Sequence, residues 1–132
     1  MNVRRALHSD LDAVLAVEGK WSTTPHWTRK QFEAELDDSN SIFLVADGGF
    51  LVARRYPHEL QLLDVAVGEL RKGVGRALLT SLMRENLRPI TLEVSDKNPG
   101  AQAFYEAQGF RVVGRRPKFY NDGSDAVLMD LS

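Results

Sequence analysis

The sequence contains no cysteine in its 132 residues. Without a thiol the chain has no disulfide bond, no thiolate metal ligand and no cysteine nucleophile. Its three histidines, His8, His26 and His58, lie far apart and do not have the spacing of a metal site. We therefore expect neither a disulfide-stabilised protein nor a metalloprotein.

Long apolar runs are also missing. No segment approaches the roughly 20 apolar residues that span a bilayer, and residues 1–10 lack the apolar core of a signal peptide. The 17 Lys and Arg residues nearly balance the 18 Asp and Glu residues, and the formal net charge of −1 lacks the basic excess of a nucleic-acid-binding protein. We expect a soluble, cytoplasmic protein that binds neither nucleic acid nor membranes.

The remaining composition is that of an ordinary globular protein. Apolar residues make up 43% of the chain and charged residues 27%. A chain of this length is the size of one ordinary domain with a sizeable core, and it contains no internal repeat, linker or low-complexity tract. We predict a single domain over residues 1–132.

The first half of the chain predicts helices followed by strands. Thr28 and Gln31 have the spacing of a capping box, and Trp27 and Phe32 are placed to form a hydrophobic staple around it. Apolar, strand-like runs then flank the turn signal Asp47-Gly48. The expected elements are a strand at 2–6, a helix at 9–19 opened by Ser9 with Asp12, a helix after Thr28, and strands at 41–46, 49–55 and 60–67.

The second half alternates helix and strand signals. Pro89 prevents one helix from continuing, and alternate residues of 90–95 are apolar. Asn98 is a favourable N-cap before Pro99, and Gly109 is a favourable left-handed C-cap. The expected elements are a helix at 73–87, a strand at 90–95, a helix between Asn98 and Gly109, and strands at 110–114 and 125–131. The order β-α-α-β-β-β-α-β-α-β-β predicts an α/β fold, a mixed sheet with helices on both faces.

A glycine-containing loop, LRKGVGRALL at 70–79, opens the helix after the fourth predicted strand. Gly73 and Gly75 allow backbone N–H groups to converge at a helix N-terminus, where fixed dipoles and nearby cations bind phosphate. Close packing of the helix through small residues explains the same glycines. The loop is not a dinucleotide fingerprint, since Leu78 replaces the third glycine, and it is not a P-loop. The cations around it are Arg71, Lys72 and Arg76.

Two chemically active side chains follow the loop. Glu93 lies on the polar side of the alternating strand, and Tyr105 lies on the apolar stripe of the next helix. A carboxylate and a phenol can serve as general base and general acid. A solvated strand face and a packed core aromatic explain the same two positions, so spacing alone leaves both interpretations open.

The succession RKGVGRALL and then TLEVSDKNPGAQAFYEAQGFRVVGRR resembles the GNAT acetyltransferase family. Nearly the whole chain is similar to the bacterial ribosomal-protein alanine acetyltransferase (RimI) branch of that family. The likeness includes Pro25 and Trp27, with His26 inserted between them, the strand ELQLLDVAV, with Asp64 in place of the usual Asn, and the ending RRPKFYNDGSDAVLM. The family motif N-x-x-A-x-x-x-Y-x-x-x-G-F is matched by Asn98, Ala101, Tyr105, Gly109 and Phe110.

The resemblance implies the GNAT fold, whose central mixed sheet splays at the fourth strand, and acetyl-CoA as co-substrate. Loop amides would hold the pyrophosphate, and the splayed strand would pair with the pantetheine arm at a β-bulge and stabilise the oxyanion. Glu93 would be the general base, through water, and Tyr105 the general acid. The implied co-substrate contacts are Val65, Ala66, Val67, Arg71, Lys72, Gly73, Val74, Gly75, Arg76 and Asn98, the last explained equally well by N-capping. The implied acceptor contacts are Trp27, Phe119 and Tyr120, for which packing is the alternative.

The implied reaction is direct attack of an amine on acetyl-CoA, because no cysteine is present for a relay. A protein N-terminal amine has a pKa of about 7.7–8.0, so a carboxylate base removes its proton more easily than that of a lysine, whose pKa is near 10.4. We therefore expect acetylation of a protein N-terminus, such as a ribosomal protein's terminal alanine, by a monomer or weak dimer. The alternatives are acetylation of a lysine or small-molecule amine, and a catalytically weak acyl-CoA-binding module. The loop from Val67 to Gly73 is shorter than in the family, and Phe119 replaces the first Tyr of the usual pair.

Overall fold

The computed structural model describes residues 2–20, 27–69 and 72–132. The chain divides into two compact units. The first unit comprises Met1–Arg55 and Leu62–Asn86, and the second comprises Tyr56–Gln61 and Leu87–Ser132. The strand β4 contributes to both units. The single domain expected over residues 1–132 stays a prediction.

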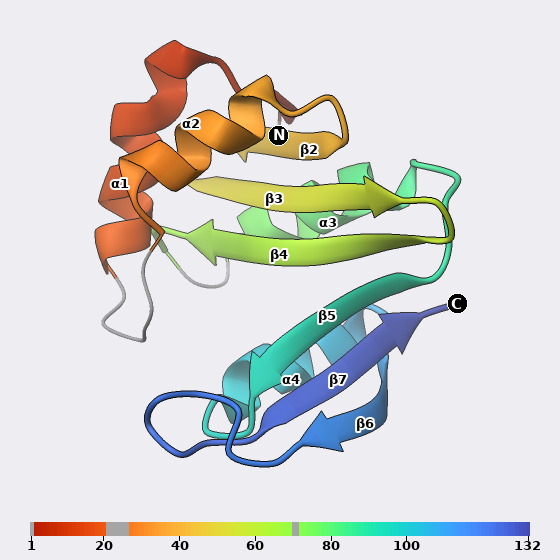
Figure 1. Cartoon of the computed structure of the whole chain (residues 1–132). Coiled ribbons are helices and arrows are strands. Elements are labelled where there is room, and N and C mark those ends of the chain that lie inside the picture. Colours follow the sequence, from red (N-terminus) through yellow and green to blue (C-terminus); the bar gives the residue numbers. More distant parts are fainter. Residues whose placement is uncertain (1, 21–26, 70–71) are drawn as a thin grey trace. The chain divides into compact units, whose positions relative to one another are not determined.

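The first unit contains the N-terminal strands, flanked by helices on both faces. Strands β1, β2, β3 and β4 are neighbours in that order, and the β1–β2 and β2–β3 pairs are antiparallel. Figure 1 shows α1 and α2 on one face of these strands and α3 on the other. The elements are β1 (Arg4–Arg5), a 3-10 turn (His8–Asp10), α1 (Leu11–Lys20), α2 (Arg29–Asp37), β2 (Ser41–Ala46), β3 (Gly49–Tyr56), β4 (Glu59–Val67) and α3 (Val74–Met83).

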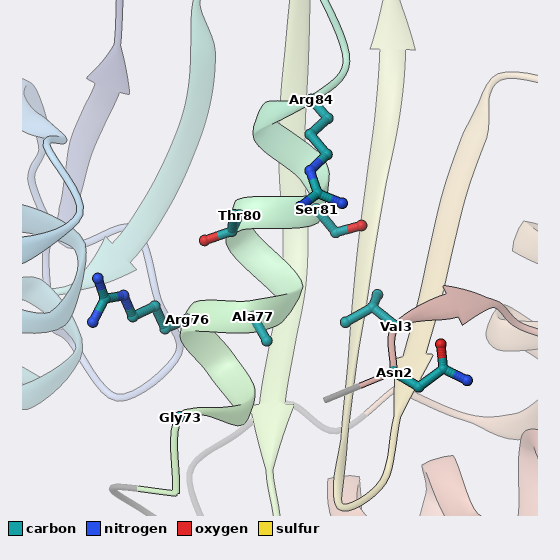
Figure 2. Close-up of a pocket in the computed structure, with 8 residues that line it drawn as sticks. All are labelled: Asn2, Val3, Gly73, Arg76, Ala77, Thr80, Ser81 and Arg84. Carbon is teal, nitrogen blue, oxygen red and sulfur yellow. The ribbon is translucent and has the colours of Figure 1, made fainter.

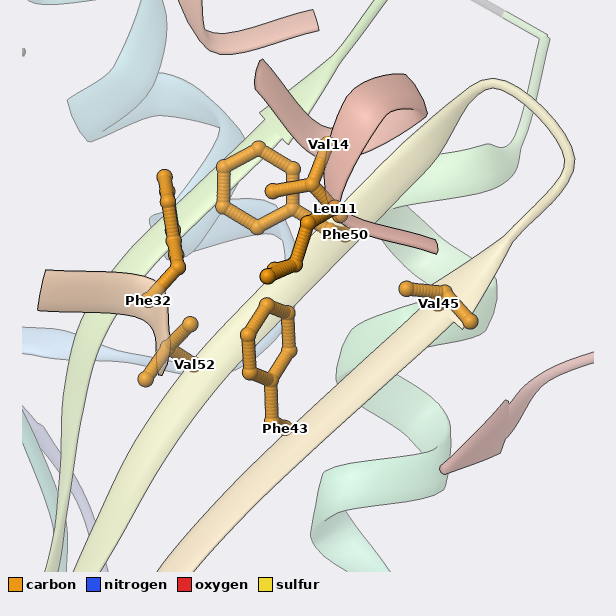
Figure 3. Close-up of a cluster of buried hydrophobic side chains, with 7 residues drawn as sticks. All are labelled: Leu11, Val14, Phe32, Phe43, Val45, Phe50 and Val52. Atoms are coloured by element: carbon orange, nitrogen blue, oxygen red, sulfur yellow. The ribbon is translucent and has the colours of Figure 1, made fainter. Parts of the chain in front are cut away.

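The core beneath α1 and α2 is rich in phenylalanine. Phe32 of α2 is fully buried, and its ring lies 5.3 Å from that of Phe50 and 5.7 Å from that of Phe43, between ring centroids. Aromatic pairs at such distances add to the free energy gained by burial. Figure 3 shows the cluster between the two helices and the strands β2 and β3. Its members are Leu11, Val14, Phe32, Phe43, Val45, Phe50 and Val52.

The opposite face of the first unit is covered by α3. This helix buries one apolar stripe, made of Val74, Leu78, Leu79 and Leu82. A Cβ atom added to Gly49 of β3 would lie 2.6 Å from Val74 Cγ1 and 3.3 Å from Leu78 Cδ1. The absence of a side chain at Gly49 therefore lets the first turns of α3 lie close to the sheet.

The prediction that Ser9 caps the first helix is wrong. A 3-10 turn precedes α1, and the N–H of Leu7 donates to Asp10 Oδ2 at 2.7 Å. The Arg4 guanidinium also pairs with Asp10, at 2.7 Å, and these bonds hold the pKa of Asp10 below its usual range. Asp12, the expected partner of Ser9, instead pairs with Arg29 of α2. A contact with the N-terminal strand thus moved the start of the helix.

The predicted capping box of α2 is confirmed. The N–H of Thr28 donates to Gln31 Oε1 at 2.8 Å, and the N–H of Gln31 donates to Thr28 Oγ1 at 3.2 Å. The rings of Trp27 and Phe32 lie 5.3 Å apart, as expected of the hydrophobic staple. Trp27 is therefore fixed beside the aromatic core.

The second unit pairs the end strands of the chain. Strand β5 (Ile90–Ser95) pairs antiparallel with β7 (Ala126–Leu131) along its whole length, and β7 pairs antiparallel with β6 (Arg111–Arg116). Helix α4 (Pro99–Ala107) covers one face of β5 and β7 (Figure 1). The predicted caps of α4 are confirmed, because Asn98 Oδ1 accepts from the N–H of Ala101 at 3.1 Å and Gly109 has φ +101°.

Strands β4 and β5 pair in parallel over a short ladder. The ladder consists of Leu60 with Ile90 and Gln61 with Thr91, and it is reinforced by the Thr91 hydroxyl, which donates to Glu59 Oε2 at 2.6 Å. Beyond these pairs β4 continues through Val67 as a neighbour of β3. The resulting seven-stranded order β1-β2-β3-β4-β5-β7-β6 confirms the predicted mixed sheet.

The predicted extent of α3 was too long. The helix ends at Met83, whereas the sequence predicted a helix to Leu87 with Pro89 as the stop. Leu82 is the last buried residue of its apolar stripe, and Glu85 pairs with Arg55 of β3 at 2.7 Å. The chain therefore leaves the helix as soon as no apolar side chain anchors a further turn.

Among the described residues, no helix is long and apolar enough to span a membrane.

Candidate active site

The N-terminus of α3 presents open backbone donors. Gly73 is its N-cap with φ +79°, and within the described part of the chain no atom lies within 4 Å of a Cβ added there. The N–H of Ala77 donates to the carbonyl of the N-cap, Gly73, at 3.0 Å. The N–H groups that precede Ala77 in the first turn have no carbonyl of the helix to bond, so they point out of the helix end. The first turn carries no acidic residue. This terminus is suited to bind an anion through the amides of Val74, Gly75 and Arg76.

A shallow cavity of about 450 Å³ lies along the side of α3 that begins at Gly73. Figure 2 shows Arg76 and Thr80 extending from one side of the helix, and Ala77 and Ser81 nearer to Val3. Guanidinium and hydroxyl groups in one cavity favour a negatively charged or polar ligand. The lining residues are Asn2, Val3, Gly73, Arg76, Ala77, Thr80, Ser81 and Arg84.

The cations expected around the glycine loop are only partly described. Arg71 lies outside the described residues. The Lys72 ammonium is exposed and lies 3.9 Å from the Glu69 carboxylate, and Arg76 is exposed on α3. Backbone donors at the helix end are therefore better fixed than the side-chain charges that surround them.

The last part of β4 holds the strand residues predicted to contact the co-substrate. Val65, Ala66 and Val67 are each partly buried. The strand ends at Val67, and the N–H of the next residue, Gly68, donates to the carbonyl of Gly48 in the β2–β3 turn at 2.7 Å. The position of this strand end is thus fixed by the turn of the neighbouring hairpin.

Glu93 of β5 lies in a small cluster of polar and aromatic groups in the second unit. The Arg116 guanidinium lies 3.7 Å from its carboxylate and 5.5 Å from the ring centroid of Phe119. The rings of Phe119 and Tyr120 lie 5.0 Å apart. Burial raises the pKa of Tyr120, and the negative charges of Glu93 and Asp122 raise it further. The structure therefore brings Glu93, Phe119 and Tyr120 together.

Hydrogen bonds fasten the loop that carries Tyr120 to the end of β5. The Ser95 hydroxyl lies 2.9 Å from the hydroxyl of Ser124, which is 2% exposed, and Ser124 in turn donates to Asp122 Oδ1 at 2.5 Å. The N–H of Tyr120 donates to the carbonyl of Ser124 at 3.1 Å. Because Ser95 lies two positions beyond Glu93 on the same strand, these bonds hold the phenol and the carboxylate in one arrangement.

Comparison with known proteins identifies the family. The GNAT acetyltransferase domain model matches residues 16–132. The ribosomal protein bS18-alanine N-acetyltransferase of Escherichia coli K12 is 31% identical over 145 aligned residues, which cover 99% of this chain and 97% of that protein. The chain belongs to the GNAT acetyltransferase family. It is therefore an N-acetyltransferase, and acetyl-CoA is its co-substrate.

Solved GNAT structures agree with the fold described above. The crystal structure of the E. coli ribosomal-protein-S18-alanine N-acetyltransferase superposes with a TM-score of 0.86 at 28% identity and covers 98% of this chain and 92% of its own. Ard1 from Thermoplasma volcanium gives a TM-score of 0.84 at 29% identity, with 98% and 95% of the two chains covered. The expected GNAT fold is confirmed.

The residues at the start of α3 fit the anionic part of the GNAT co-substrate. The left-handed N-cap, the open space at Gly73 and the outward N–H groups together form the kind of site that binds a phosphate oxygen. The roles of the individual side chains stay predictions.

Two residues that the GNAT motif singles out have clear structural roles. Tyr105 of α4 is 9% exposed, and its ring packs against those of Phe104 and Phe110 at centroid distances of 5.4 and 5.7 Å. Asn98 caps the same helix. The packing and capping interpretations of these residues therefore hold, and their catalytic and co-substrate roles in the GNAT reaction stay predictions.

Sequence reasoning missed three features of this GNAT site. It quoted Arg116 only as part of a motif, because β7 lies between the strands of Arg116 and Glu93 and no local pattern links them. It missed the bond between Ser95 and Ser124, because these residues lie 29 positions apart in the chain. The sequence showed that Asp64 replaces the usual Asn of the family, which could have marked this position as unusual. It did not show that the Asp64 carboxyl interacts with Glu18 of α1.

Proposed function

We propose that this GNAT enzyme acetylates the N-terminal α-amine of a protein, such as a ribosomal protein. The observation that carries the proposal is the position of Phe119 and Tyr120 beside Glu93. A peptide could pack against these two aromatic rings with its N-terminus next to the carboxylate. The similarity to bS18-alanine N-acetyltransferases over nearly the full chain supports it. We also propose that the enzyme is cytoplasmic and acts as a monomer or weak dimer.

In this proposal Glu93 accepts, through a water molecule, the proton that the attacking amine must lose. The amine nitrogen forms a bond to the acetyl carbonyl carbon, and a backbone N–H among Val65–Val67 stabilises the negative charge on the carbonyl oxygen. The carbon–sulfur bond then breaks, and Tyr105 donates its phenolic proton to the departing thiolate. Only proton transfers to and from this chain's residues are required, in keeping with the absence of cysteine.

The start of α3 would hold the pyrophosphate in the same proposal. The N–H groups of Val74, Gly75 and Arg76 supply donors, while Lys72 and Arg71 supply charge. Asn98 would contact the co-substrate from the start of α4. Trp27 would line the acceptor side, with its ring fixed against Phe32 at 5.3 Å.

The test is acetyl-CoA turnover, measured as free thiol release, with a panel of acceptors. The panel contains short peptides with a free N-terminus, the same peptides with a blocked N-terminus, lysine-containing peptides and polyamines. Turnover that requires a free N-terminus, above all one beginning with Ala, supports the proposal. Turnover only with lysine or polyamines would keep the enzyme class and overturn the acceptor. Acetyl-CoA binding without turnover on any acceptor would favour the binding-module alternative.

A further inference from the structure

The loop between β6 and β7, which carries Phe119 and Tyr120, begins with an unfavourable backbone turn. Lys118 has φ +49°, and among residues 2–20, 27–69 and 72–132 it is the one residue other than glycine with a positive φ. A Cβ atom disfavours this conformation, and turns with a proline before a residue of positive φ usually have Gly or Asn there. Pro117 precedes Lys118 in this turn. A contact of the folded protein is therefore needed to hold Lys118 in place.

The side chain of Asp125, at the other end of the loop, supplies this contact. The N–H of Lys118 donates to Asp125 Oδ1 at 2.9 Å, and Arg115 Nη1 donates to Asp125 Oδ2 at 3.0 Å. The hydrogen bond from Lys118, followed by that from Arg115, holds the pKa of Asp125 below its usual range. The carboxyl group is therefore ionised at neutral pH, and it joins the two ends of the loop.

Asp125 is itself fixed to the end of β5. Its N–H donates to Asp96 Oδ1 at 3.2 Å, and the N–H of Asp96 donates to the carbonyl of Asp125 at 3.0 Å. Asp96 directly follows β5, the strand that contains Glu93, and Figure 1 shows the loop beside this end of the strand. Through Asp96 and Asp125, the strand of the candidate base is thus connected to the backbone directly before Phe119.

We propose that Asp125 is a positioning residue, which keeps the turn at Lys118 left-handed and thereby fixes the two aromatic side chains where the acceptor binds. The backbone at Lys118 directs the side chains of Phe119 and Tyr120, because these residues follow it directly and belong to no helix or strand. The bonds of Ser124 reach the loop only from Tyr120 onward, so they do not fix Lys118. The proposal rests on the proposed function for the acceptor role of the aromatic residues, but not for the hydrogen bond.

Loss of the Asp125 carboxylate should weaken acceptor binding selectively. Without it, Lys118 returns to the negative φ that residues with a Cβ prefer. The fraction of molecules with both aromatic side chains in place then falls, and the acceptor KM rises by the same factor because only this fraction binds. A saturating acceptor restores the arrangement, so kcat should change little. The hydrogen bonds of Asp125 involve no residue of α3, so the acetyl-CoA Kd should stay constant.

The first experiment measures amide hydrogen exchange at Lys118 by NMR, with the full chain and no acceptor. We expect this amide to be protected in wild type. In Asp125→Ala it should exchange at least about tenfold faster, as for the loss of a hydrogen bond to a charged group. An unprotected Lys118 amide in wild type would overturn the proposal without any variant. Equal protection in wild type and Asp125→Ala would also overturn it, whatever the acceptor is.

Two further variants are matched controls for the exchange experiment. Asp125→Asn retains an oxygen that accepts from the N–H of Lys118, so the protection should remain. Arg115→Gln removes the ion pairs of Arg115 with Asp96 and Asp125 but leaves the bond to Lys118, so the protection should remain there too. Loss of protection in Arg115→Gln to the same extent as in Asp125→Ala would overturn the role of the Asp125–Lys118 bond.

The second experiment measures the acceptor KM with whichever acceptor the turnover panel identifies. Asp125→Ala should raise this KM about five- to thirtyfold, the population factor that corresponds to the usual cost of a positive φ. Arg115→Gln should change it by about twofold or less, as for an exposed ion pair. A lysine or polyamine acceptor would overturn the proposed function and still allow this measurement. An unchanged KM in Asp125→Ala, despite loss of protection at Lys118, would overturn the positioning role.

Substitution of Lys118 separates positioning from a general loss of stability. Glycine adopts a positive φ about as readily as a negative one, so Lys118→Gly added to Asp125→Ala should lower the acceptor KM toward wild type. Lys118→Gln added to Asp125→Ala is the matched control, because it removes the same charge but retains the Cβ, and it should leave the KM high. Equal KM values in the two double variants would overturn the proposal, since φ at this position would then have no effect on acceptor binding.

Discussion

The Arg116 guanidinium of β6 lies 3.7 Å from the Glu93 carboxylate of β5, measured between Nη2 and Oε1. The same guanidinium lies over the ring of Phe119, at 5.5 Å from its centroid. One cation therefore links the candidate base to the aromatic residues proposed to bind the acceptor. The side chain of Arg116 is 57% exposed, so water screens this ion pair and its contribution is small.

Replacing Arg116 tests this link. Arg116→Gln removes the charge beside Glu93 and the cation–π contact with Phe119, which we expect to raise the acceptor KM by about two- to fivefold, as for the loss of an exposed ion pair. The acetyl-CoA KM should not change. Arg111→Gln is the matched control, because Arg111 lies on the same strand but pairs with Asp130. Equal effects of the two substitutions would show that only the charge of β6 matters.

Glu93→Gln tests the proposed base. Gln has nearly the same shape but cannot accept a proton, so kcat should fall by a factor of about 10²–10⁴. The acetyl-CoA Kd, measured by calorimetry, and the thermal midpoint should stay close to wild type. Retained turnover in this variant would remove Glu93 from the mechanism.

Tyr105→Phe separates the packing role of Tyr105 from its proposed acid role. The ring contacts with Phe104 and Phe110 depend on the aromatic ring, so they remain without the hydroxyl. We expect a fall in kcat, of about 10²-fold or less since a thiolate is a fair leaving group, with a change in thermal midpoint of only a few degrees. A full kcat would leave Tyr105 as a core residue only.

Gly73→Ala tests the left-handed cap at the start of α3. The φ of +79° costs a residue with a Cβ about 1–2 kcal/mol, although no atom of residues 2–20, 27–69 and 72–132 lies within 4 Å of the added carbon. We expect lower stability in urea unfolding and weaker acetyl-CoA binding. The control is Gly19→Ala, also without a contact within 4 Å but inside α1, where it should stabilise by about 0.5–1 kcal/mol. Unchanged acetyl-CoA affinity in Gly73→Ala would exclude this turn from the co-substrate site.

Local patterns predicted most of the fold. The apolar runs around Asp47-Gly48 specify strands that are buried on both faces. The alternation in 90–95 specifies a strand with one buried face, which a shift by one residue would expose. Caps at Thr28 and Asn98 were found because both act within a few residues. The start of α1 and the end of α3 were wrong, since the Arg4–Asp10 and Arg55–Glu85 pairs join segments that local spacing cannot relate.

The residues of the candidate site that belong to a sequence motif were predicted. The contacts that form only when distant segments come together on folding were missed. The glycine loop, Glu93 and Tyr105 follow from a run of sequence with family-specific spacing. The pairs Glu93–Arg116 and Glu18–Asp64 depend on strand order and helix packing instead. Spacing alone left a solvated Glu93 and a chemically active Glu93 both open, whereas the strand order places the Arg116 guanidinium 3.7 Å from its carboxylate.

The Asp64 carboxyl should make the stability of this enzyme fall as the pH rises. Burial raises its pKa to about 8 in the folded protein, against an ordinary value of 3.8 that we take for the unfolded chain. Between these values the folded state holds a proton that the unfolded state has released, so the free energy of unfolding decreases with pH and the loss is complete above about pH 8. The slope from one such proton is at most about 1.4 kcal/mol per pH unit.

Asp64→Asn removes this titration, so its advantage in thermal midpoint over wild type should grow from about pH 4 to about pH 8 and then stay constant. Circular dichroism melts at several pH values measure the difference directly. Asp37→Asn serves as the control, since the Asp37 side chain is 75% exposed and its ion pair is with His8, which is also exposed. A difference between Asp64→Asn and wild type that does not change with pH would mean that Asp64 is ionised in the folded enzyme.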